Sequence, residues 1–156
     1  ARIYCHASGY GMAHSSVKFG TLTGSEAGLT NAVNNALADA GMTIDDIDAV
    51  FGFANGMKAV DDVEIKGLTA VFGDKLAEKP VVELKEVLGE SRAAAATTAA
   101  AHAALMFAGK IPSQEAYSIA ADGSVSKTNV EASKLNNVLV AAYGAGGSYT
   151  AIVLSK

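Results

Sequence analysis

Apolar residues recur along the chain with changing periods, and these periods predict its elements. Leu29, Val33 and Leu37 lie four residues apart, which predicts a helix over residues 25–40 that Gly41 ends as a C-cap. Short apolar runs bounded by glycine, proline or acidic residues predict buried strands. Taken together, the patterns predict further helices over 60–72 and 90–108, and strands over 1–12, 47–53, 80–84, 137–143 and 148–155.

The order of these elements is β-α-β-α-β-α-β-β, which predicts an α/β domain with helices on a central mixed sheet. The last two strands flank the glycine turn at 144–147 and are expected to form an antiparallel hairpin. Residues 113–133 are polar and are expected to form an irregular surface loop, and residues 44–46 a turn. No repeat or long linker interrupts the pattern, so residues 1–156 are expected to form one domain.

The helix expected over residues 90–108 consists mostly of alanine. Alanine allows neighbouring backbones to come close and loses little side-chain entropy in a helix. A solvated helix would carry more Glu and Lys. We therefore expect this helix to be buried between two layers.

Composition and charge exclude several classes of function. The net charge is −4 and no run of Lys or Arg occurs, so a nucleic-acid partner is not expected. No apolar run reaches the roughly 18–20 residues that span a bilayer, so no membrane partner is expected. Cys5 is the single cysteine, which excludes an internal disulfide and fits a reducing cytoplasm. The chain begins at Ala1 with a strand-like run, as the interior of a longer sequence would.

Neither a cofactor nor a metal site is predicted. The glycine run at 144–147 lacks the lysine and the following helix of a phosphate-binding loop. His6 and His14 flank the first strand, and a metal site between them is a minor alternative. His102 lies in the middle of the alanine-rich helix and is expected to be a packed or hydrogen-bonded core residue.

Three segments of the chain resemble the C-terminal half of the β-ketoacyl-ACP synthases (ketosynthases), which have the thiolase fold. In that family a strand ends in His-Gly-Thr-x-Thr, followed by Asp-x-x-Glu and by a helix that ends in Phe-Gly. Here residues 53–57 read Phe-Ala-Asn-Gly-Met, Asp61 and Glu64 match the acidic pair, and residues 72–73 are Phe-Gly.

The second and third segments follow in the family's order. The family's Lys-x-x-x-Gly-His resembles the stretch from Lys85 to Glu90, and its glycine-rich close resembles residues 141–149. The resemblance spans nearly the whole chain but only about half of a ketosynthase, and it implies a thiolase-like half-domain. The family's nucleophilic cysteine belongs to the other half, so Cys5 does not match it by position.

The departures from the family pattern concern the catalytic positions. In the family, two histidines stabilise the enolate and thioester oxygens during decarboxylation and condensation. Phe53 and Glu90 occupy their positions here. Phenylalanine donates no hydrogen bond and an ionised glutamate repels an oxyanion, and each lost donor costs about 2.7–4 kcal/mol of transition-state stabilisation. The resemblance therefore implies that this chain does not support condensation.

The resemblance also implies roles for other residues. Lys85 matches the lysine that organises the family's active site, and Glu90 is expected to pair with it. Asp61 and Glu64 are expected to cap and bridge rather than to transfer protons. The acyl pocket is expected to include Phe53, Asn55, Gly144, Ala145 and Gly146, with Ala145 in place of a bulky phenylalanine.

Three functions remain open at this point. The first is a non-condensing partner subunit of fatty-acid or polyketide assembly, similar to the chain-length factors, that shapes a complex or an acyl pocket. The second is an acyltransferase or hydrolase that takes its nucleophile from the other half, and the third is a self-associating binding module without enzymatic activity. The expected partners are the N-terminal half or a second ketosynthase-like chain, with an acyl carrier protein as a further partner.

Overall fold

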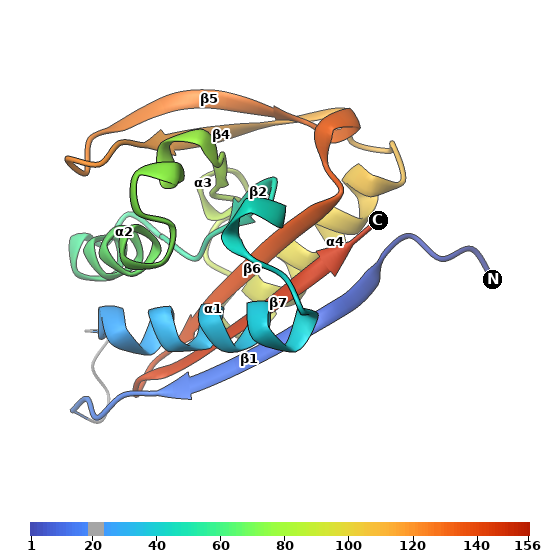
Figure 1. The fold of residues 1–156 in the computed structure, drawn as a ribbon. Coiled ribbons are helices and arrows are strands. Elements are labelled where there is room, and N and C mark those ends of the chain that lie inside the picture. The colour runs from blue at the N-terminus through green and yellow to red at the C-terminus, as the bar shows by residue number, and fades with distance from the viewer. Residues whose placement is uncertain (19–23) are drawn as a thin grey trace.

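The structure is a computed structural model that describes residues 1–18 and 24–156. Within these residues, one seven-stranded sheet has the order β1-β7-β6-β2-β3-β4-β5 (Figure 1). Its strands are β1 (His6–His14), β2 (Ala49–Phe51), β3 (Val81–Val82), β4 (Ser113–Ile119), β5 (Val125–Glu131), β6 (Asn137–Gly144) and β7 (Ser148–Ser155). The helices are α1 (Glu26–Ala40), α2 (Lys58–Phe72), α3 (Lys85–Leu88) and α4 (Ala95–Phe107), with short 3₁₀ turns at η1 (Ile44–Asp46), η2 (Gly73–Glu78), η3 (Arg92–Ala94) and η4 (Ala132–Lys134).

The predicted mixed sheet with helices packed on it is confirmed, and the helices cover both of its faces. Strand β2 is parallel to β3 and to β6, whereas β6 and β7 form the predicted antiparallel pair. Successive residues of a strand point to opposite faces. Val50 accordingly packs into the core beneath α1 and α2, while its neighbours Ala49 and Phe51 pack against α4. The molecule thus has three layers, with α1 and α4 on opposite sides of the sheet (Figure 1).

Helix α1 lies unusually close to β1 because the strand carries glycine where the helix crosses it. A Cβ atom on Gly9 would lie 2.4 Å from the Ala36 carbonyl oxygen, and one on Gly11 would lie 2.0 Å from that of Ala32. Neither distance leaves room for a side chain. The predicted C-cap of α1 is also confirmed, since Gly41 is left-handed and its N–H bonds the carbonyls of Leu37 and Ala38.

The prediction of an irregular loop at residues 113–133 is wrong, because this segment forms the hairpin β4–β5 at the edge of the sheet. The hairpin turns at Asp122 and Gly123, where Gly123 has φ +81°. An Asp-Gly pair between two strand-forming runs is a hairpin signal. The sequence of this segment is polar because one face of an edge hairpin is exposed to solvent. On the hairpin, Lys127 forms an ion pair with Glu115 of the neighbouring strand at 2.7 Å.

The alanine-rich helix was expected to be buried on two faces, but only one of its faces is covered. It begins at Ala95 rather than at residue 90, because Gly89 and Arg92 both have positive φ and turn the chain sharply. One face, with Ala99, Ala103 and Met106, packs on the sheet. The opposite side, with Ala101 and Leu105, is exposed. Burial between two layers is therefore wrong for this chain taken alone.

No helix within the described residues combines the length and the apolar character needed to cross a membrane.

Candidate functional site

The centre of the site is the loop at residues 53–57, which follows β2. Its backbone is held by two carboxylates of α2. The N–H groups of Phe53 and Ala54 donate to the two oxygens of Glu64 at 2.7 and 2.9 Å, and the Asn55 N–H donates to Asp61 at 3.0 Å. Glu64 is fully enclosed, whereas Asp61 lies nearer the surface. These bonds give both acids the capping and bridging role that the sequence predicts.

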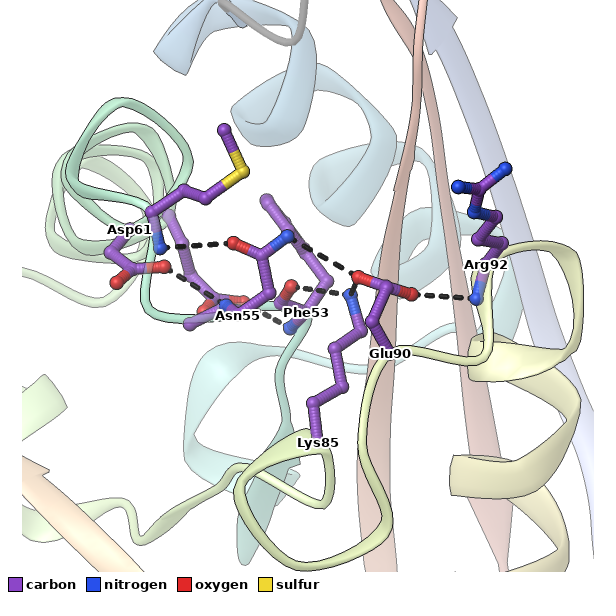
Figure 2. A network of polar contacts seen from close by, with 9 residues as sticks. Phe53, Asn55, Asp61, Lys85, Glu90 and Arg92 are labelled. Atoms are coloured by element: carbon purple, nitrogen blue, oxygen red, sulfur yellow. Dashed lines mark hydrogen bonds and ion pairs between the residues drawn. The ribbon is translucent and has the colours of Figure 1, made fainter.

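Lys85 reaches this loop because β2 and β3 are parallel neighbours whose carboxyl ends meet at one edge of the sheet. Its Nζ donates to the Phe53 carbonyl oxygen at 2.8 Å and pairs with Glu90 Oε2 at 3.1 Å (Figure 2). The Lys85 side chain is 16% exposed and that of Glu90 is 39% exposed. The predicted ion pair is therefore present, and Lys85 does not extend into solvent.

Glu90 is held on both of its oxygens. Oε2 accepts from the Asn55 side-chain amide at 3.2 Å as well as from Lys85, and Oε1 accepts from the Arg92 N–H at 2.6 Å (Figure 2). Partial burial raises the pKa of Glu90, but the hydrogen bonds from Arg92, Lys85 and Asn55 outweigh it and bring the pKa below its ordinary value. Glu90 is thus a fixed anion near neutral pH.

Phe53 presents only a hydrocarbon ring at this site. The ring is buried and packs against Tyr143 with a centroid distance of 5.7 Å, and Tyr143 in turn stacks on Tyr149 at 5.0 Å. The Tyr143 hydroxyl is buried without a partner among the described residues. Burial and the neighbouring Tyr149 raise the pKa of Tyr143, so this group is a neutral phenol.

A groove of about 670 Å³ joins these residues to the alanine-rich helix. Phe53, Lys85, Glu90, Gly144 and Ala145 all line it, so five of the residues predicted for the site share one surface. The remainder of its lining comes largely from α4 and from strands β6 and β7. No histidine or cysteine occurs among the described residues that line it. The groove can hold an apolar chain, but its described lining offers neither a cysteine nor an acid–base histidine, and its hydroxyl groups belong to Tyr143, Ser148 and Thr150.

Two residues predicted for the pocket lie outside this groove. Asn55 lines a second cavity, of about 420 Å³, and its side-chain amide reaches Glu90. Gly146 belongs to the turn between β6 and β7, with φ +95°, and does not line the groove.

A second acid beside this loop, the partly buried Glu83, was not predicted from the sequence. Its carboxyl lies beside that of Glu64 and hydrogen-bonds to it. Burial raises the pKa of Glu83 well above its ordinary value, and the Glu64 carboxylate raises it further. Glu83 therefore holds its proton to a higher pH than an ordinary glutamate and donates it to Glu64, which already accepts two amide N–H groups. A charged residue inside the apolar run Val81-Val82-Glu83-Leu84 is the signal that could have identified it.

The histidines take no part in this site. His6 and His14 lie at the two ends of β1, about 26 Å apart along an extended strand, so they do not share a metal ion. His102 packs against the Phe51 ring, with centroids 6.1 Å apart, and burial lowers its pKa; this is the core role predicted for it. Within the described residues, no group of three or more His, Cys, Asp or Glu side chains is arranged to hold a metal.

Comparison with known proteins identifies the family of the chain. Residues 4–118 match the family model described as "Beta-ketoacyl synthase, C-terminal domain". Two Streptomyces proteins, provisionally named polyketide beta-ketoacyl synthase 2, are similar over 134 residues, at 29% identity in Streptomyces halstedii and 31% in Streptomyces coelicolor. The matched region is 85% of this chain but only 32% of each relative. The matched region thus spans about a third of the length of each of these relatives.

Solved structures share the fold over the full length of the chain. The structure titled "The ishigamide ketosynthase/chain length factor" superposes with a TM-score of 0.83 at 24% identity, over 100% of this chain and 39% of that one. A type II polyketide ketosynthase in complex with its acyl-carrier protein gives a TM-score of 0.78 at 18% identity, over 99% of this chain and 39% of that one. The predicted thiolase-like fold is confirmed, and the chain belongs to the β-ketoacyl synthase family, as a member of its C-terminal domain.

Proposed function

We propose that this chain is part of a non-condensing ketosynthase-like subunit of fatty-acid or polyketide assembly, which shapes an acyl pocket or a complex rather than forming carbon–carbon bonds. The observation that carries this proposal is the state of Glu90. Its carboxylate is fixed by hydrogen bonds from Asn55, Lys85 and Arg92, and by the motif resemblance of residues 85–90 we assign it to the position of a family histidine.

The electrostatics of the groove support this proposal. An oxyanion in a transition state needs hydrogen-bond donors aimed at it. The Phe53 side chain supplies no hydrogen-bond donor. The Lys85 ammonium group already donates to the Phe53 carbonyl and pairs with Glu90. The buried Tyr143 hydroxyl is a single donor and does not replace two histidines.

The exposed face of α4 supports a partner. Leu105 of α4 is 40% exposed, and Val87 and Leu88 of the preceding helix α3 are 73% and 60% exposed. Large exposed apolar side chains are candidates for protein contacts. The relatives are about three times as long as this chain. We therefore assign this face to the remaining part of a ketosynthase-like protein, in which the alanine-rich helix would lie between two layers.

The partners follow from the same proposal. One solved neighbour is a ketosynthase/chain length factor and another is a ketosynthase in complex with its acyl-carrier protein. By analogy, a second ketosynthase-like chain is the expected neighbour of this one, and an acyl carrier protein is a further partner.

Native mass spectrometry of the protein isolated from its natural source tests the proposal. We expect a heteromeric mass that includes a ketosynthase-like component. Sequencing that component, and the polypeptide that completes this chain, shows where a nucleophile lies. A nucleophilic cysteine or serine in the completing polypeptide would overturn the proposal in favour of an acyltransferase or hydrolase. A mass that is a simple multiple of 15.8 kDa would overturn it in favour of a self-associating module.

A further inference from the structure

Strand β1 forms one edge of the sheet (Figure 1), and its own sequence gives it little protection against pairing with a further strand. Proteins commonly protect an edge strand with charged side chains, proline or a bulge. Strand β5, at the other edge, carries Lys127. Strand β1 reads HASGYGMAH and contains no Lys, Arg, Asp, Glu or proline. A bulge interrupts it between Ala7 and Gly9, so its regular and unprotected part is residues 9–14.

This regular part of β1 presents apolar side chains as well as a backbone edge. Gly9 and Gly11 face α1, so Tyr10 and Met12 between and beside them point to the opposite face of the sheet. Their side chains are 51% and 56% exposed. A long edge strand with exposed apolar side chains is a template for the addition of another strand.

Two side chains of α1 occupy the backbone groups at this edge. The Tyr10 N–H donates to Asp39 Oδ2 at 2.9 Å, and the Asn35 side-chain amide donates to the Met12 carbonyl oxygen at 3.2 Å. Residues two apart in a strand direct their backbone groups to the same side, which here is the side away from β7. Asn35 and Asp39 lie four residues apart and therefore share one face of the helix. Such short side chains reach over the edge because the two glycines bring α1 close to β1.

We propose that Asn35 and Asp39 form an autoinhibitory contact, which keeps the β1 edge closed by occupying a donor and an acceptor that an added strand would bind. The strand that fits this edge is an antiparallel segment with the sequence of β1. In the register centred on Gly11, Tyr10 lies opposite Met12 of the added strand, so the outward N–H and C=O groups of the two strands pair. The same register places a tyrosine ring beside a methionine side chain, which is a favourable cross-strand contact.

The contact is independent of the function proposed above, because none of the described residues that line the Glu90 groove belongs to α1 or β1. Helix α1 lies directly over β1, so a second folded copy would bring its own helix to the same place. A free peptide with the sequence of residues 6–14 carries no helix and is therefore the probe.

Amide hydrogen exchange followed by NMR tests whether the contact protects the edge. In the variant Asp39→Ala the Tyr10 N–H loses its acceptor, and we expect its exchange to be about tenfold faster than in the natural protein. Asp39→Asn removes the charge but keeps an oxygen acceptor, so it should keep the natural exchange rate of Tyr10.

Fluorescence anisotropy with the labelled peptide tests whether the contact closes the edge. We expect the double variant Asn35→Ala/Asp39→Ala to bind the peptide at least about tenfold more tightly than the natural protein does. The control Asn34→Ala/Asp74→Ala makes the same chemical changes at two exposed residues and should bind as the natural protein does. A peptide carrying Met12→Pro lacks the N–H that pairs with Tyr10 and should bind neither protein.

The outcomes separate cleanly. Tighter peptide binding by the double variant, with NMR shifts at Tyr10 and Met12, would support the proposal. It would be overturned by equal affinity of the natural protein and the double variant, by binding to neither, or by equal binding of the Met12→Pro peptide. If circular dichroism shows the double variant unfolded, Asp39→Ala against Asp39→Asn makes the same comparison, and equal peptide affinity of those two variants would overturn the proposal.

Discussion

Glu64 and Glu90 hold the same loop from opposite sides, and their surroundings differ. Glu64 is enclosed and accepts the backbone N–H groups of Phe53 and Ala54. Glu90 borders an open groove and accepts from side chains as well as from one backbone N–H. The enclosed acid therefore determines whether the loop keeps its shape, whereas the open acid determines which charge the groove presents. Substitutions of these acids should separate stability from function.

The largest effect is expected from Glu64→Ala. Two buried amide N–H groups would lose their acceptor, at about 1–3 kcal/mol each, so the free energy of unfolding should fall by about 2–6 kcal/mol. Urea denaturation measures this change. The matched variant Glu131→Ala, at an exposed position, should change stability by less than about 0.5 kcal/mol. Equal losses in the two variants would show that Glu64 does not hold the loop.

A smaller loss of stability is expected from Gly52→Ala, which places a methyl group against the Glu64 and Glu83 carboxyls. A Cβ atom there would lie 2.0 Å from Glu83 Oε1 and 2.7 Å from Glu64 Oε1. Separating the two acids should cost about 1–3 kcal/mol, as overpacking usually does. Gly144→Ala is the control, because its Cβ would have no neighbour closer than 3.7 Å. If both variants melt at the same temperature, the two acids are not packed against Gly52.

The acid pair should also make stability depend on pH. The pKa of Glu83 is raised by burial and by Glu64 above its ordinary 4.5, so the folded chain keeps a proton that the unfolded chain releases. The stability contributed by this proton is complete below pH 4.5 and is lost as the pH rises through the folded pKa. The slope is at most about 1.4 kcal/mol per pH unit for one proton.

Urea unfolding of Glu83→Gln across the same pH range isolates this contribution, since the amide does not titrate. We expect the downward slope between pH 4.5 and neutrality to be shallower in Glu83→Gln than in the natural protein. Glu131→Gln should keep the natural slope. Parallel profiles for all three proteins would mean that Glu83 carries no extra proton when folded.

The smallest effect on stability is expected from Glu90→Gln. Its side chain is 39% exposed, and exposed ion pairs contribute about 0–1 kcal/mol. The pKa of Glu90 is lowered, so this small contribution is present above its ordinary pKa of 4.5 and is lost as the pH falls through the folded value. Thermal unfolding at neutral pH measures it. A loss as large as that of Glu64→Ala would remove the distinction between the two acids.

The features that depend on local sequence were predictable. The Gly41 cap, the alternation of strands and helices, and the Lys85–Glu90 pair all follow from residues close together in the chain or from the family pattern. The hairpin at residues 113–133 was missed because its exposed face is polar and only the Asp-Gly turn marks it. Glu83 was missed because its role arises from Glu64, which is nineteen residues away in the sequence and is brought beside it only by the packing of α2 on the sheet.

The alanine-rich helix shows a different limit of sequence reasoning. Its composition indicated two covered faces, yet the described chain covers one. Under the function proposed above, the remaining part of a ketosynthase-like protein covers the other face of this helix.

The central claim is that Phe53 and Glu90 leave this site unable to condense. Its most direct test is an assay of carbon–carbon bond formation from an acyl thioester and a malonyl thioester. The native assembly should be used, with the nucleophile of any condensing partner replaced by alanine, so that product can come only from this chain's site. We expect no product above background from the natural sequence, nor from Glu90→His, because Phe53 still lacks a donor. Measurable product from either protein would contradict the claim.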